Sequence, residues 1–133
     1  MDIKVTWQDK MLFEGVGPSG HVVAMDAAQN VGGEDREARP FELMLIALGG
    51  CTGMDVISIL RKMRTPPNSF EVSIHATQAE EHPKAVQRAQ LAYKAHGVPE
   101  ENLRKAVDLS HERYCSVSHS LGAELETSVE ALP

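Results

Sequence analysis

The chain has 133 residues, of which 42% are hydrophobic and 24% are charged, and its net charge is −6. These values fit one globular domain over residues 1–133 that buries about two-thirds of its unfolded surface, and they exclude a disordered chain. The negative charge offers no general attraction for phosphate, so nucleic acid is not expected as a partner. No uninterrupted apolar run reaches the roughly 20 residues that cross a membrane. The N-terminus also lacks the pattern of a signal peptide, and we expect a cytoplasmic protein.

Alternating apolar residues predict three strands near the N-terminus. Ile3, Val5 and Trp7 alternate with polar residues, and residues 11–16 and 21–25 form two further strand patterns separated by glycine turns. Residues 26–40 contain two glycines and a run of mixed charges, which indicates an exposed loop. A loop of this length in a small domain is often functional or partly disordered.

A long apolar helix is predicted from Pro40 to about Arg64. Proline suits a first helical turn, and a further pair of prolines follows the expected end. Apolar residues surround the helix as far as Leu48, which predicts burial on all sides. Gly49 and Gly50 each cost up to about 1 kcal/mol relative to alanine inside a helix. They indicate either the close packing of another element or a kink, and the sequence does not favour one over the other.

The second half of the chain alternates strands with one more helix. Residues 70–76 and 86–95 have the period of strands, residues 100–114 have that of an amphipathic helix, and residues 122–132 alternate again. The predicted order is therefore β-β-β-α-β-β-α-β. This order predicts an α+β domain with two half-sheets around a long central helix.

The only two cysteines occupy different settings. Cys51 lies in the middle of the apolar helix, and Cys115 lies where the second helix is expected to end. Cytosolic thiols are normally reduced, so a permanent disulfide is the less favoured interpretation. Two thiols that meet can instead react in turn, one attacking an oxidant and the other resolving the product as a disulfide.

Metal binding is an alternative use of the same thiols. Both cysteines and one histidine could hold zinc, but no closely spaced pair of ligands occurs in the sequence. A surface role is favoured for His119, which follows Cys115 by four residues. No glycine-rich phosphate loop follows a strand either, and we expect neither a metal nor a cofactor.

Two segments carry a resemblance to a known family, and each contains one cysteine. They are residues 39–64, RPFELMLIALGGCTGMDVISILRKMR, and residues 106–117, AVDLSHERYCSV. With them the chain resembles the OsmC/Ohr family of thiol-dependent peroxidases, and within it the YhfA-like subgroup, over essentially the whole domain. The resemblance implies an intertwined homodimer in oxidative-stress defence. It also implies that Cys51 attacks an organic hydroperoxide, that Cys115 resolves the sulfenic acid, and that a dithiol or a lipoylated protein supplies electrons.

The family also uses a glutamate and an arginine near the first thiol, and here the match is incomplete. The family's glutamate follows the helix-opening proline directly, whereas this chain has Phe41 there and Glu42 one residue later. Nine helical residues turn through about 900°, which places Glu42 opposite Cys51 and favours a role at the helix start. Arg39 and Arg36 are candidates for the arginine by proximity alone.

A carboxylate beside the first thiol opposes its activation. Asp55 lies four residues after Cys51 on the same helical face, and its charge raises the pKa of the thiol. We therefore expect that an arginine compensates if the reaction is fast. Two further functions on the same fold remain open, a module that binds a small apolar ligand and a thiol redox sensor.

Overall fold

The computed structural model describes residues 1–133 and divides into two compact units, Met1–Leu45 and Ile46–Pro133. The α+β class and the predicted order of strands and long helices are confirmed, with short helical turns added between them. In chain order the elements are β1 (Lys4–Asp9), β2 (Leu12–Val16), β3 (Val22–Met25), η1 (Gln29–Val31), α1 (Pro40–Lys62), β4 (Ser69–Gln78), β5 (Val86–His96), α2 (Glu100–Leu109), η2 (Ser110–Tyr114), α3 (Ser116–Ser120) and β6 (Glu124–Leu132). The expectation of a single domain over residues 1–133 stays a prediction.

The first unit contains an antiparallel meander in the order β1-β2-β3. Trp7 pairs with Phe13 across β1 and β2, and the register shifts between Trp7 and Asp9. The indole N–H of Trp7 donates to the carbonyl of Lys10 at 2.8 Å, and Lys10 has a φ of 44° in the tight turn between the strands. The alternation of apolar and polar residues predicted β1 correctly, because successive side chains of a strand point to opposite faces of the sheet.

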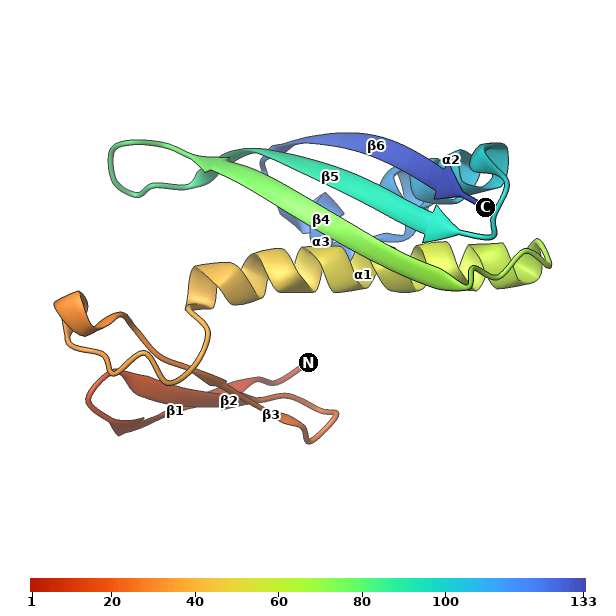
Figure 1. Ribbon diagram of the computed structural model, residues 1–133. Coiled ribbons are helices and arrows are strands. Elements are labelled where there is room, and N and C mark those ends of the chain that lie inside the picture. Colours follow the sequence, from red (N-terminus) through yellow and green to blue (C-terminus); the bar gives the residue numbers. More distant parts are fainter. The chain divides into compact units, whose positions relative to one another are not determined.

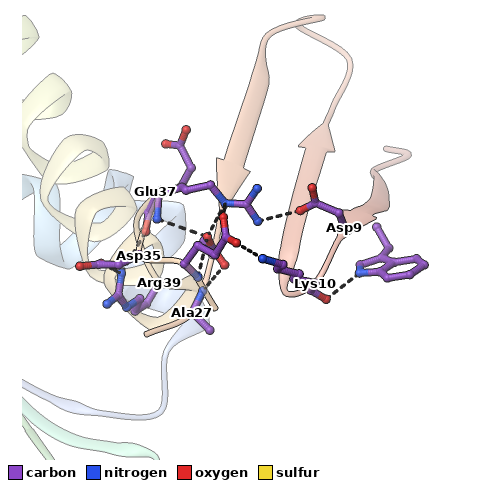
Figure 2. A network of polar contacts seen from close by, with 10 residues as sticks. Asp9, Lys10, Ala27, Asp35, Glu37 and Arg39 are labelled. Atoms are coloured by element: carbon purple, nitrogen blue, oxygen red, sulfur yellow. Dashed lines mark hydrogen bonds and ion pairs between the residues drawn. The ribbon is translucent and has the colours of Figure 1, made fainter. Parts of the chain in front are cut away.

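The loop between β3 and α1 lies in a network of polar contacts that includes Ala27, Asp35 and Arg39 (Figure 2). The buried carboxylate of Asp26 orders this loop. Its oxygens accept the backbone N–H groups of Ala27 at 2.7 Å, Arg36 at 3.2 Å and Glu34 at 3.4 Å. The Arg36 guanidinium donates to Asp26 at 3.0 Å and to Asp9 at 2.7 Å. The loop was expected to be functional or partly disordered. These bonds give it a defined path, and a functional role for it stays a prediction.

The second unit is a three-stranded sheet packed on helices (Figure 1). Strand β5 lies between β4, which is antiparallel to it, and β6, which is parallel to it. A parallel neighbour requires a crossover connection, and α2, η2 and α3 provide it. The buried apolar residues of this unit are Leu48, Val56, Leu60, Ala89, Leu91, Tyr93, Ala95, Val98, Leu103, Ala106, Val107 and Cys115.

Helix α1 is buried on one side and exposed on the other. Leu48, Val56 and Leu60 are fully buried, but Ile46 is 61% exposed and Met54 is 76% exposed. The prediction of burial on all sides is therefore wrong within a single chain, because apolar composition does not reveal which face has a partner. By length and composition alone, α1 would also suffice to cross a membrane. Its packing in the core cluster identifies it instead as a core helix.

Close packing accounts for the first glycine before Cys51. A methyl group at Gly49 would lie 3.1 Å from Cδ1 of Ile74 on β4, whereas one at Gly50 would meet no atom within 4 Å. Helix α1 continues through both positions without interruption. Of the two interpretations, the structure therefore favours close approach of the sheet at Gly49.

Acid should destabilise the first unit through Asp26. Burial raises the pKa of this carboxyl, but hydrogen bonds from Ala27 and Arg36 outweigh burial and lower the pKa from 3.8 to about 2. A lowered folded-state pKa contributes stability above about pH 4, and that contribution is lost as the pH falls toward 2. Fluorescence of Trp7, the single tryptophan, should report this transition. Asp26→Asn should weaken the unit at neutral pH and flatten its response between pH 4 and pH 2.

The matched control is Asp2→Asn, which changes an exposed carboxylate of the same unit. It should reproduce the wild-type acid transition. An unchanged acid midpoint in Asp26→Asn would show that the loop does not depend on this charge.

Candidate thiol site

The two cysteines are positioned by different elements of the second unit. Cys51 lies near the middle of α1, and Cys115 joins η2 to α3. The predicted helix over residues 100–114 ends as an α-helix at Leu109 and continues as the π-helical turn η2. The N–H of Cys115 donates to Ser110 at 2.9 Å, and its sulfur caps α3 by accepting the N–H of Ser118 at 3.4 Å.

The fold brings both sulfurs and one carboxylate together. Cys51 Sγ, Cys115 Sγ and a carboxylate oxygen of Asp55 all lie within 4.8 Å of one another. Both cysteines are free thiols in the structure, with Cys51 half-buried and Cys115 fully buried. Ser116 adds a hydroxyl 3.9 Å from the sulfur of Cys51. The arrangement exposes one thiol to solvent-borne reagents and keeps the second behind it.

The surroundings of the thiols move their pKa values in opposite directions. Burial raises the pKa of Cys51, but the hydrogen bonds from the N–H of Val117 and from Cys115 and Ser116 outweigh it, so that the pKa falls below its ordinary value. Burial also raises the pKa of Cys115, and there the contacts with Ser118 do not reverse the effect. Cys51 is therefore the more acidic thiol and the better nucleophile of the pair.

A chain of hydrogen bonds leads away from Asp55 into the core. Ser110 donates to Asp55 at 2.9 Å and contacts Thr52 at 2.9 Å, Thr52 contacts Tyr93 at 2.8 Å, and Tyr93 contacts Nε2 of His111 at 2.6 Å. Each hydroxyl has one proton to donate, so an ionised Asp55 orients the whole chain toward itself. Nε2 of His111 is then the donor at the far end.

The pKa values of Tyr93 and His111 agree with this direction of proton donation along the hydrogen-bond chain. Burial raises the pKa of Tyr93 to about 12, so its phenol keeps the proton that it donates to Thr52. Burial also lowers the pKa of His111, which favours the neutral imidazole at pH 7. The chain is thus a fixed set of neutral donors that ends at one carboxylate beside the thiols.

Sequence reasoning did not identify the polar residues of this chain. Ser110 lies on the buried face of the predicted helix together with Leu103 and Val107, and all three are fully buried. A polar residue on a buried helical face requires a hydrogen-bond partner. The position of Ser110 among apolar residues was therefore the sequence signal for a buried polar contact. Thr52 is likewise a polar residue inside a buried stretch of α1.

The structure places the family-inferred Arg39 and Glu42 in the first unit. Arg39 pairs with Asp35 at 2.6 Å and also donates to the carbonyl of Glu37 at 3.1 Å. Glu42 is exposed in the first turn of α1, in keeping with a role at the helix start. An arginine was expected to offset Asp55, whereas hydrogen bonds within the second unit lower the pKa of Cys51. Catalytic roles for Arg39 and Glu42 stay predictions.

The fold and the paired thiols define an α+β protein with a dithiol site between a core helix and a crossover connection. Residues 32–130 match the family described as OsmC-like protein, and the chain belongs to that family. The chain is 37% identical to Protein YhfA of Escherichia coli strain K12 over 120 residues, which are 89% of this chain and 87% of that one. The resemblance to the family and to its YhfA-like subgroup is thereby confirmed.

Solved structures confirm the fold. A hypothetical protein from Aquifex aeolicus VF5 is 28% identical, with a TM-score of 0.85 over 98% of this chain and 94% of that chain. The organic hydroperoxide resistance protein OhrB of Bacillus subtilis is 15% identical, with a TM-score of 0.63 over 98% of both chains. At that identity the second comparison shows a shared fold alone.

Two substitutions beside Cys51 should move its pKa in opposite directions. Asp55→Asn removes a charge that raises the pKa of the thiol, so the pKa should fall further. Ser116→Ala removes a hydrogen bond that favours the thiolate, so the pKa should rise. The rate of alkylation by iodoacetamide as a function of pH measures both, with Cys115→Ser as the background. Shifts of the same sign in the two variants would contradict this account of the site.

Proposed function

We propose that this protein reduces organic hydroperoxides through Cys51 and Cys115 and serves in oxidative-stress defence. The observation that carries the proposal is the meeting of a half-buried thiol with a buried one within 4.8 Å. The opposite pKa directions give the two thiols different chemical roles. The family assignment supports the same reading, as does the fold shared with a protein named for organic hydroperoxide resistance.

In the first step the Cys51 thiolate attacks the terminal oxygen of the hydroperoxide. The O–O bond breaks, the sulfur is oxidised to a sulfenic acid, and the alkoxide leaves and takes up a proton to become an alcohol. The lowered pKa of Cys51 increases the fraction of this thiol that is present as thiolate. Its partial exposure gives the peroxide access, and the buried Cys115 is not in competition for it.

In the second step Cys115 attacks the sulfenic sulfur of Cys51. A disulfide forms, and the leaving hydroxide combines with the proton of Cys115 to give water. The pKa of Cys115 is raised, so a base beside it assists the attack. Asp55 is within 4.8 Å of both sulfurs, and its bond from Ser110 holds it in place for this transfer. An external dithiol or lipoylated protein then reduces the disulfide, and a cytoplasmic location would supply such reductants.

Mass spectrometry after one equivalent of cumene hydroperoxide tests the mechanism. The mass of the wild type should decrease by two hydrogen atoms as a Cys51–Cys115 disulfide forms. Cys115→Ser should stop at the sulfenic acid of Cys51 and proceed with excess peroxide to irreversible overoxidation. Cys51→Ser should reduce turnover with dihydrolipoamide to the uncatalysed rate.

The folded state of each variant is checked by circular dichroism, and His119→Gln serves as a control on an exposed residue near α3. If Cys51 stays a free thiol in folded wild type, the peroxidase proposal is wrong and an apolar-ligand module takes its place. If the disulfide forms but turnover is absent with every dithiol supplied, the protein is a redox sensor.

We also propose that the working form is a homodimer. Large apolar side chains are exposed in both units, including Trp7 at 61%, Val5 at 55% and Met54 at 76%. Association of two copies would cover such side chains, and a closed two-fold dimer is the commonest arrangement.

Light scattering at micromolar concentration should give twice the chain mass of 14.5 kDa. Met54→Glu, which places a charge on the exposed face of α1, should shift the mass toward that of one chain. Lys62→Glu, at the exposed end of the same helix, is the matched control and should leave the mass unchanged. A wild type of 14.5 kDa at this concentration would overturn the dimer.

A further inference from the structure

We propose that the reduced protein binds one thiophilic divalent cation, with Zn²⁺ as the best fit, through the sulfurs of Cys51 and Cys115 and a carboxylate oxygen of Asp55. Nothing in the proposed peroxidase cycle requires this cation. The reduced dithiol binds the cation when no peroxide is present.

The three ligand atoms are already grouped at nearly the spacing that zinc requires. They lie within 4.8 Å of one another. Bonds of about 2.3 Å to sulfur and 2.0–2.2 Å to oxygen place the ligands of a tetrahedral zinc about 3.5–3.8 Å apart, so the closure needed is about 1 Å. Cys51 and Asp55 are four residues apart on one face of α1, and Cys115 approaches from the junction of η2 and α3. A helical i, i+4 pair and one ligand from a second element form a chelate with little loss of chain freedom.

A supporting hydrogen bond already orients the carboxylate. Ser110 donates to Oδ2 of Asp55, and this leaves Oδ1 as the oxygen free to bind a cation. Thr52 holds Ser110 in turn, and both hydroxyls are fully buried. Outer-shell bonds of this kind fix the direction of a metal-binding side chain and raise its affinity. The buried hydrogen-bond chain therefore has the form of a metal site's outer shell.

The donor set selects the class of cation. Two thiolates are soft ligands that favour Zn²⁺ over Mg²⁺ or Ca²⁺, and a single carboxylate is compatible with zinc. Three protein ligands leave the fourth position to water, as in open zinc sites. Cys51 and Asp55 are half-buried, which provides a path of entry. From the sequence, a histidine was the candidate third ligand and no metal was expected, whereas the structure supplies the carboxylate of Asp55 in that place.

Metal binding and disulfide formation exclude each other, because both use the same two sulfurs. A disulfide between Cys51 and Cys115 leaves no thiolate for the cation, and a bound cation withdraws the Cys51 thiolate from attack on peroxide. The redox state of the pair therefore controls the affinity for the metal. Binding requires deprotonated sulfur, so the cation also displaces protons as it enters.

Titration with Co²⁺, a spectroscopic substitute for Zn²⁺, tests the proposal on the full chain. The protein is reduced, freed of reductant and kept without oxygen. Wild type should bind one Co²⁺ per chain with a sulfur-to-cobalt charge-transfer band, and one equivalent of Zn²⁺ should abolish that band. Cys51→Ser and Cys115→Ser should each remove most of the band, and Asp55→Asn should weaken binding. Ser110→Ala should lower the Zn²⁺ affinity by about 10- to 100-fold, the range typical of outer-shell partners.

Two controls separate this site from adventitious binding. Asp108→Asn and His119→Gln change exposed ligand-type residues outside the cluster and should keep the wild-type affinity. Wild type oxidised to the disulfide should bind no Co²⁺ at this site. A missing charge-transfer band in reduced wild type, or an unchanged band in folded Cys51→Ser, overturns the proposal. The assay contains no peroxide, so its outcome is independent of whether the protein turns over hydroperoxides.

Discussion

The hydrogen bonds made by Ser110 are the interaction on which the thiol site depends. This hydroxyl joins Asp55 and Thr52 of α1 to the start of η2, the segment that leads to Cys115. It is fully buried, so loss of both partners would leave a polar group without compensation in the core. The bond therefore fixes the distance between two elements that are far apart in the sequence, and with it the approach of the two sulfurs.

The local chemistry of the pair follows from an asymmetry in burial and hydrogen bonding. Cys51 is half-buried and receives the N–H of Val117, whereas Cys115 is enclosed and caps α3. Asp55 acts against the thiolate of Cys51 through its charge, yet it sits where a base or a metal ligand would be useful. The Asp55 carboxylate is thus unfavourable for the Cys51 thiolate in the first proposed step, and it is suited to be a base in the second step or a metal ligand of the reduced thiols.

The sequence was sufficient for the fold but only partly for the site. Alternation in β1 and β5 is readable because each sheet residue takes one of two faces, and both strands were predicted. The exposure of Ile46 was missed, since an apolar residue carries no mark of what covers it. The hydrogen bonds of Thr52 with Tyr93 and with Ser110 join residues that are 41 and 58 positions apart in the sequence. No local period encodes such pairs. Asp26 was missed for a related reason, because three of its hydrogen bonds come from backbone N–H groups, which every residue carries.

The π-helical turn η2 has a mechanical consequence for the site. Its last bond runs from the N–H of Cys115 back five residues to Ser110, so the turn contains more chain than an α-helical turn of the same rise. That surplus lies directly before Cys115 and ahead of β6, which is held in the sheet by its parallel pairing with β5. Rewinding η2 toward α-helical bonds would shift Cys115 while both strands keep their register. The extra backbone in η2 would allow Cys115 to change position without a change in the pairing of β5 and β6.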